Sequence, residues 1–304
     1  MPTGIAAGPM TERAVSAAPV RGSRPSIMSI LHLMRDRRVA FASGMLLVAA
    51  IVAAVGPLVV PYPYDLMGAG PPVEAMSRAH PMGTDQFGRD QLSRVVWGTR
   101  ISLGVPLVVL AGAIGLGLPL GLLIGYARGL IDSVLSRVLD VMFAFPVLLL
   151  VLVLATLLGP GLATATFALV MVYVPVVARL IRGAVIVESE REYIVAARVV
   201  GATPSRIVVR HILPSITSPV LVFATSIMAF SILAEAAISF LGVGAQPPAS
   251  SWGKMLTDSS AYYSTAPYLA VFPGLAIIYL VLALNLLGDG LRDQLDPHSL
   301  SSIH

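Results

Sequence analysis

The chain has 304 residues, of which 56% are hydrophobic and only 12% are charged, and its mean hydropathy is +0.85. These values lie outside the range of soluble globular domains, so we expect an integral membrane protein. The absence of cysteine excludes disulfides and thiol chemistry, and basic loops that orient a protein at lipid headgroups explain the net charge of +4 more simply than nucleic-acid binding does.

The N-terminal region combines a polar tail with a membrane anchor. Residues 1–28 are rich in Ala, Pro, Gly and Ser and are expected to form a mobile cytoplasmic tail. Residues 29–38 mix apolar side chains with arginines, which is typical of a helix lying at a membrane surface. A first membrane span is expected at 39–60, and its apolar run is too long for a cleavable signal peptide.

A polar connection, expected outside the cell, occupies residues 61–100. Thr84 or Asp85 is expected to cap a short helix there. The aromatic side chains of this helix would reach the membrane interface, and its arginines would face water or headgroups. These arginines are Arg89, Arg94 and Arg100.

Five more apolar segments are long enough to be membrane spans, and several contain proline, which predicts kinked helices. They lie at 101–126, 141–158, 163–181, 216–241 and 268–287. The sequence therefore predicts an all-α membrane protein with about six transmembrane helices. The membrane domain would occupy 29–290, with an outer segment at 242–267 and a cytoplasmic tail at 291–304.

The distribution of lysine and arginine predicts the orientation. With the N-terminus inside, 15 of the 20 basic residues fall on the cytoplasmic side. The five on the outer side are Arg78, Arg89, Arg94, Arg100 and Lys254. This three-to-one excess fits the positive-inside rule and places both termini in the cytoplasm.

The stretch from Glu188 to Ser215 is charged and helix-forming, so it must lie in water. One stripe of its first helix is expected to consist of Tyr193, Ala196, Ala197 and Val200. Gly201 fits a left-handed cap that ends this helix. Thr203 and Pro204 are typical of the start of a second helix, expected to run to Leu213.

The same stretch carries a family resemblance. Ala196-Ala197, three residues, Gly201 and then Leu213-Pro214 resemble the EAA loop of the membrane subunits of ABC importers. Val195 and His211 replace the usual Glu and Ile, as in the branch that imports dipeptides, oligopeptides and nickel chelates. The segments 80–100, 232–256 and 284–297 resemble the C-type permease of this branch, so that the resemblance spans about residues 29–297.

This resemblance implies the type I ABC importer permease fold and a set of partners. They are a second, related permease, two P-loop ATPase subunits and an extracytoplasmic binding protein, all at a cell membrane. No cofactor would bind to this chain, because ATP and magnesium would bind to the ATPases. Di- or oligopeptides are the implied substrate, with nickel chelates, glutathione or another small solute as alternatives.

The resemblance also assigns roles to residues. Residues 183–215 would form the loop that couples the permease to an ATPase. The candidate coupling residues are Glu192, Tyr193, Ala196, Ala197, Arg198, Gly201, Arg206, Leu213 and Pro214. The outer mouth of the pathway would be shaped, or merely braced, by Asp85, Arg89, Asp90, Arg94, Arg100 and Trp252.

Glu235 is the one acid inside a long apolar segment. Because a charge at the bilayer centre costs roughly 2.5 to 3.5 kcal/mol, its side chain should face a partner or a water-filled cavity. It would line a gate or contact the amino terminus of the substrate, or it would make a structural contact with a nearby arginine or backbone donor. The candidates for the pathway are Ser218, Thr225, Ser226, Ser231, Glu235, Ser239 and Asn285.

No catalytic site is expected. The sequence has no P-loop motif, and its five histidines are scattered outside the expected spans, so we expect neither an enzyme nor a metal site. Two alternatives to the importer remain at this point. One is a stand-alone secondary transporter with Glu235 as a proton relay, and the other treats the charged loop as a basic helix lying on anionic lipid.

Overall fold

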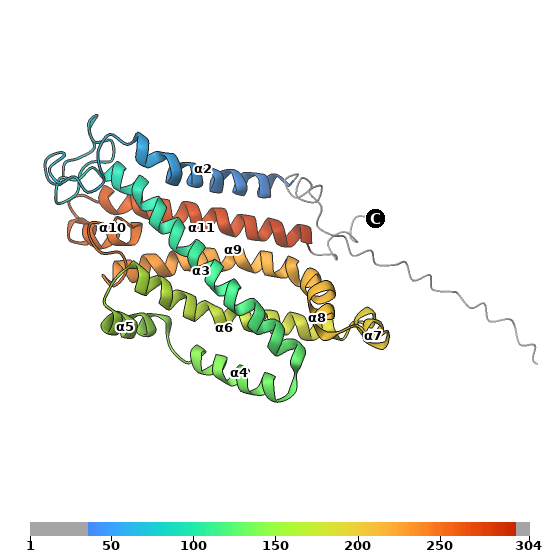
Figure 1. Cartoon of the computed structure of the whole chain (residues 1–304). Coiled ribbons are helices and arrows are strands. Elements are labelled where there is room, and N and C mark those ends of the chain that lie inside the picture. The colour runs from blue at the N-terminus through green and yellow to red at the C-terminus, as the bar shows by residue number, and fades with distance from the viewer. Residues whose placement is uncertain (1–35, 296–304) are drawn as a thin grey trace, which may run out of the picture.

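The computed structural model describes residues 36–295, and within them the chain is a bundle of helices without a named strand (Figure 1). The tail expected at 1–28, most of the surface helix expected at 29–38 and the end of the expected C-terminal tail lie outside the described residues. In chain order, the elements are α2 (Arg37–Val59), α3 (Gln91–Ala127), α4 (Gly129–Phe143), α5 (Val147–Leu158), α6 (Leu162–Ser189), α7 (Glu192–Val199), α8 (Pro204–Ile207), the π-helix η1 (Val208–Ile212), α9 (Leu213–Phe240), α10 (Trp252–Ser259), the short 3-10 helix η2 (Ser260–Tyr262) and α11 (Tyr268–Leu295).

Five helical segments of the described chain are long and apolar enough to cross a membrane. They are α2, α3, α6, the continuous run Pro204–Phe240 and α11. The segment expected as one span at 141–158 is divided in the structure, because α4 and α5 meet within it at an angle of 83°. Pro146 stands at the break, where its ring removes a backbone donor and restricts the residue before it. If the bent pair counts as one span, the total is six.

Two pairs of segments that were expected to be separate form continuous helices. α3 starts at Gln91, so the helix expected ahead of residue 101 is the first part of the span itself. Its cap is Asp90, whose carboxylate accepts from the backbone N of Ser93 at 2.8 Å, and neither Thr84 nor Asp85 has that role. Likewise, the second helix of the charged stretch does not stop at Leu213 but continues through η1 into α9.

α3 and α6 pack closely against each other, and glycines of α3 allow the two backbones to approach. Gly117, Gly121 and Gly125 follow one another at four-residue spacing on the face of α3 that meets α6. A Cβ atom added at Gly121 would lie 2.5 Å from the Cβ of Ile181, closer than real atoms approach. The glycines of α3 therefore let two backbones pack together inside an apolar bundle.

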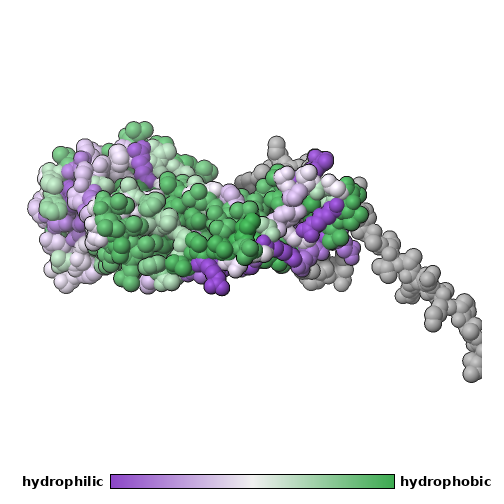
Figure 2. Space-filling model, turned by 60° about the horizontal axis from the view of Figure 1, so that its bottom comes forward, coloured by the Kyte–Doolittle hydropathy of each residue, from purple (hydrophilic) through white to green (hydrophobic). Residues whose placement is uncertain are grey.

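The bundle has two polar ends. α7 and the last turn of α11 lie at one end, here called the α7 end, and α10 with the loop 60–90 lies at the other, the α10 end (Figure 1). Arg38 and Asp293 approach to 3.7 Å at the α7 end, so the first and last described helices meet there. On the face shown in Figure 2, hydrophobic residues cover the middle and hydrophilic ones gather toward both ends, as expected of a membrane-spanning molecule.

Candidate functional site

The helix α7 projects from the bundle but is fixed to it by one side chain. Ile194 is fully buried and packs in the cluster that contains Val185 of α6, Ile207 of α8 and Ile212 of η1. A short helix in isolation is only marginally stable, so this contact and the neighbouring turns must hold it in place. The position of α7 is therefore tied to both α6 and α9.

Gly201 ends α7 in the predicted way. Its φ of +79° lies in the left-handed region, the N–H of Gly201 donates to the carbonyl of Arg198 at 3.0 Å, and the N–H of Ala202 donates to the carbonyl of Ala197 at 3.0 Å. These two bonds make a Schellman cap. A Cβ at Gly201 would meet no atom within 4 Å, so the backbone conformation alone calls for glycine here.

The residues of the expected stripe on α7 are mostly accessible. Tyr193, Ala196 and Val200 are exposed, and Ala197 is partly covered. The other coupling candidates also lie at this end of the bundle: Glu192, Arg198, Arg206 and Pro214 are exposed, and Leu213 is half-buried. Most of the candidate set is thus accessible at the α7 end of the bundle.

Three valines on this surface were not among the coupling residues expected from the sequence. Val195, Val199 and Val200 are 47%, 81% and 83% exposed, although valine is usually buried. The available signal was a short run of apolar residues inside the one stretch that must lie in water. Adjacent exposed apolar side chains on a rigid helix are typical of a surface that binds another protein.

Charged and aromatic side chains surround this valine surface. The hydroxyl of Tyr193 donates to Glu188, and its ring lies 6.3 Å from that of His211. Partial burial raises the pKa of Tyr193, and the Glu188 carboxylate raises it further, so the phenol stays protonated. The guanidinium of Arg198 lies 5.5 Å from the ring centre of Tyr126 at the end of α3.

The pathway candidates do not share one face. Thr225, Ser231 and Ser239 are buried inside the bundle. Ser218 and Ser226 are half-buried on α9, and Asn285 is exposed on α11. The Thr225 hydroxyl donates to the carbonyl of Val222 on its own helix at 2.8 Å, which is the local bond that Ser and Thr often make in membrane helices.

Glu235 is 1% exposed and receives a hydrogen bond of 2.7 Å from the hydroxyl of Ser239. Ser102 of α3 and Ser251 also face its carboxyl group. The expected partner, an arginine or a backbone donor, is wrong for the described chain, because the contacts are serine hydroxyls. Ser239 also accepts from the backbone N of Ala245 at 3.0 Å, so this group links α9 to the loop that follows it.

A buried cluster of charges organises the α10 end. Asp85 accepts from Arg89 Nε at 2.6 Å and from Arg94, and Asp258 near the end of α10 contacts Arg94 Nη2 at 3.0 Å. The expectation that Arg89 and Arg94 face water or headgroups is wrong, because they are 6% and 2% exposed. Lys254 also belongs to this cluster, because its Nζ lies 2.7 Å from Asp258 Oδ1.

The other candidate acid of the outer segment is Asp90, which is fully buried. It caps α3, and its Oδ1 lies 2.8 Å from His80 Nδ1.

Two polar side chains of α3 satisfy carbonyls that prolines leave free. Pro57 cannot donate to the carbonyl of Ala53, and Arg100 Nε donates to that oxygen at 2.6 Å. Pro273 likewise frees the carbonyl of Leu269, and the amide nitrogen of Gln91 donates to it at 2.9 Å. These contacts join α3 to α2 and to α11 where kinked helices need compensation.

Trp252 fixes α10 against the start of α3. Its indole Nε1 donates to the carbonyl of Val95 at 2.9 Å, and its ring lies where a side chain at Gly98 would stand. The outer candidates Asp85, Arg89, Asp90, Arg94 and Trp252 thus form one buried brace, while Arg100 lies beside it and is exposed. In the described residues, no group of three or more His, Cys, Asp or Glu could hold a metal ion.

The comparisons with known proteins agree with this architecture. Residues 117–300 match the family described as binding-protein-dependent transport system inner membrane component. The dipeptide transport system permease protein DppC of Alkalihalophilus pseudofirmus is 42% identical, with 81% of each chain covered. The glutathione transport system permease protein GsiD of Pectobacterium atrosepticum is 41% identical over 86% of this chain and 87% of that protein. A putative peptide transport system permease protein of Brucella abortus is 38% identical over 91% and 93%.

A solved structure shows the same fold. It is a chain from inward-facing conformations of the MetNI methionine ABC transporter, with a TM-score of 0.56, 22% identity and coverage of 67% of this chain and 97% of that one. The fold is that of a type I ABC importer permease, and the protein is a multi-pass component of the inner membrane. The chain belongs to the family of binding-protein-dependent transport system inner membrane components and is a permease subunit of an ABC importer.

Proposed function

We propose that this chain is the C-type permease of an ATP-driven importer of di- or oligopeptides, with the α7 end and both termini in the cytoplasm. It works with a second, related permease, two ATPase subunits and an extracytoplasmic binding protein. ATP and magnesium bind to the ATPases, and this chain has no catalytic role. The substrate class is supported by relatives whose names specify dipeptide and peptide transport. Glutathione, named for other relatives, is a tripeptide-sized alternative.

The observation that carries this proposal is the exposed valine surface on a fixed helix. Val199 and Val200 are more than 80% exposed, whereas Ile194 of the same helix is fully buried. A groove on an ATPase could cover the valines, and any displacement of the ATPase would then move α7 as a rigid unit. Because α8, η1 and α9 are continuous, that movement would reach a membrane span directly.

The same observation argues against the two alternatives. A stand-alone secondary transporter would leave the valine surface without a function. A helix lying on anionic lipid would be expected to carry several lysines or arginines beside its apolar face. Only Arg198 lies within α7, and the other arginines of the charged stretch, Arg191, Arg206 and Arg210, lie outside this helix. Docking on a protein explains both the valines and the fixed orientation of the helix.

The test is to place two carboxylates on this surface with Val199→Asp and Val200→Asp together and to purify the complex in mild detergent. We expect about a tenfold loss of co-purified ATPase, because two charges would be buried against an apolar groove. Met76→Asp is the matched control, since Met76 is an exposed apolar residue at the opposite end, 59% accessible. Unchanged recovery of the ATPase with the double variant would contradict the proposal.

A further inference from the structure

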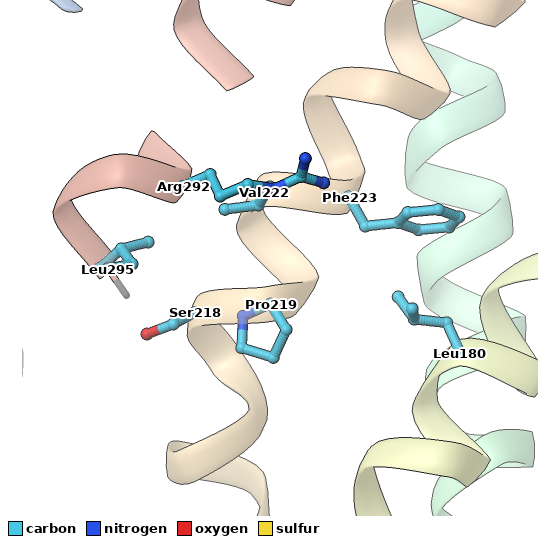
Figure 3. Close-up of a pocket in the computed structure, with 7 residues that line it drawn as sticks. All are labelled: Leu180, Ser218, Pro219, Val222, Phe223, Arg292 and Leu295. Carbon is cyan, nitrogen blue, oxygen red and sulfur yellow. The ribbon is translucent and has the colours of Figure 1, made fainter. Parts of the chain in front are cut away.

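A cavity of about 420 Å³ opens at the α7 end of the bundle, between α6, α9 and α11 (Figure 3). Its volume falls within the range of small-molecule sites. It is lined by Leu180, Ser218, Pro219, Val222, Phe223, Arg292 and Leu295. The buried brace and the valine surface described above contribute none of these residues, so the cavity is a separate feature.

The lining has the chemistry of a site for a ligand that combines a negative charge with a hydrocarbon group. Five of its seven residues are apolar, and the polar groups are the Ser218 hydroxyl and the Arg292 guanidinium. Figure 3 shows the side chain of Arg292 extending from α11 across α9 beside Val222, so that its charge lies over the apolar wall. A guanidinium matches a carboxylate with two parallel hydrogen bonds, and apolar walls accept a hydrocarbon side chain.

The cavity lies at one end of an uncovered face of α9. From Pro219 and Phe223 this face continues through Ser226 to Phe230, which is 61% exposed, and on to Leu233, which is 44% exposed. These positions follow the three- and four-residue spacing of one helical stripe. A solute that moves along this stripe toward the α7 end reaches the cavity and Arg292 after Leu233 and Phe230.

We propose that this cavity is an exit site that binds the terminal carboxylate of a peptide before its release into the cytoplasm. The inference rests on the proposed function, which supplies the peptide and the direction of movement. Every unmodified peptide carries this carboxylate whatever its side chains, so one arginine can serve many substrates. The small number of polar partners keeps binding weak enough for release.

The test uses the absence of cysteine from the chain. Leu180→Cys introduces a single thiol into the cavity wall of the full complex, in nanodiscs of phosphatidylcholine. The rate of maleimide labelling is measured with leucyl-leucine and with its C-terminal amide at equal concentration. We expect leucyl-leucine to slow labelling several-fold and the amide to have little effect, because only the free acid offers a carboxylate to Arg292.

Arg292→Gln in the Leu180→Cys background should abolish this protection, and Arg137→Gln should preserve it. Arg137 is an exposed arginine of α4 outside the cavity, so it controls for the loss of a charge. Equal protection by the acid and the amide would overturn the proposal without requiring any Arg292 variant. Protection that survives Arg292→Gln would overturn it as well.

Anionic lipid offers the same chemistry and is separated by one further arm. If phosphatidylglycerol nanodiscs protect the thiol without peptide, and Arg292→Gln removes that protection, the ligand is a lipid headgroup and the proposal fails. Either failure leaves the proposed function standing, because capture of the ATPase depends on Val199 and Val200 and not on Arg292. Loss of ATPase binding would instead be seen with the valine variant alone.

Discussion

Gly201 shows what a single residue contributes to the bend after α7. The sequence predicted a left-handed cap because glycine followed a helix-forming stretch, and the φ of +79° has the required sign. The sequence could not show that α7 ends in open space, which makes the requirement purely conformational. The position should therefore accept other residues only as far as they tolerate a positive φ.

Gly201→Val should reduce transport per ATP hydrolysed, because a β-branched side chain at positive φ costs about 1–2 kcal/mol and displaces the end of α7. Gly201→Asn is the matched control, since asparagine enters the left-handed region more readily. The measurement is peptide uptake and ATP hydrolysis in the same proteoliposomes. Normal uptake by the valine variant would be inconsistent with a coupling role for this bend.

Glu235 marks the limit of sequence reasoning at the residue scale. A lone acid in an apolar segment predicted a buried polar contact, and Glu235 is buried. Its partner Ser239 is one helical turn away, but Ser102 and Ser251 come from distant parts of the chain. A serine carries no charge that would single it out as a partner, so the sequence favoured arginine.

At the scale of elements, helices were predictable and their breaks and partners were not. The apolar runs gave the approximate positions of α2, α6, α9 and α11 because spans need about 20 apolar residues. The break between α4 and α5 was missed because Pro146 resembles the prolines that only kink other spans. A brace at the α10 end was one of the two expected roles, but its ion pairs could not be predicted, because Arg94 and Asp258 lie 164 positions apart.

Asp85→Asn should lower the stability of the brace by about 3–5 kcal/mol, because Arg89 and Arg94 would lose a buried counter-charge. Thermal unfolding in detergent measures this loss. Adding Arg89→Met to Asp85→Asn should restore part of it, since this removes a buried charge that has lost its shorter ion pair and keeps only the contact of 3.6 Å with Asp258. Glu190→Gln, which removes the partner of Arg128 in an exposed pair, should change stability by less than about 1 kcal/mol. Equal effects of Asp85→Asn and Glu190→Gln would contradict the structural role of the brace.

At the scale of the whole molecule, composition alone placed the chain in a membrane, and its motifs placed it among importer permeases. The structure adds a division of labour between the two ends. One end is braced by buried charges, while the other presents the exposed helix α7, which is followed by a continuous run of α8, η1 and α9. Exposure of the valines could not be predicted, because it depends on how α7 packs against α6 and α9.

The central claim is that this chain forms a pathway driven by ATPases that dock at the α7 end. The most direct test is to purify the tagged protein from its own membranes, identify the chains that accompany it by mass spectrometry and measure dipeptide uptake by the reconstituted assembly. We predict a second permease, P-loop ATPase subunits and uptake that requires ATP. Recovery of this chain alone, moving solute under a proton gradient, would contradict the account and shift attention to Glu235.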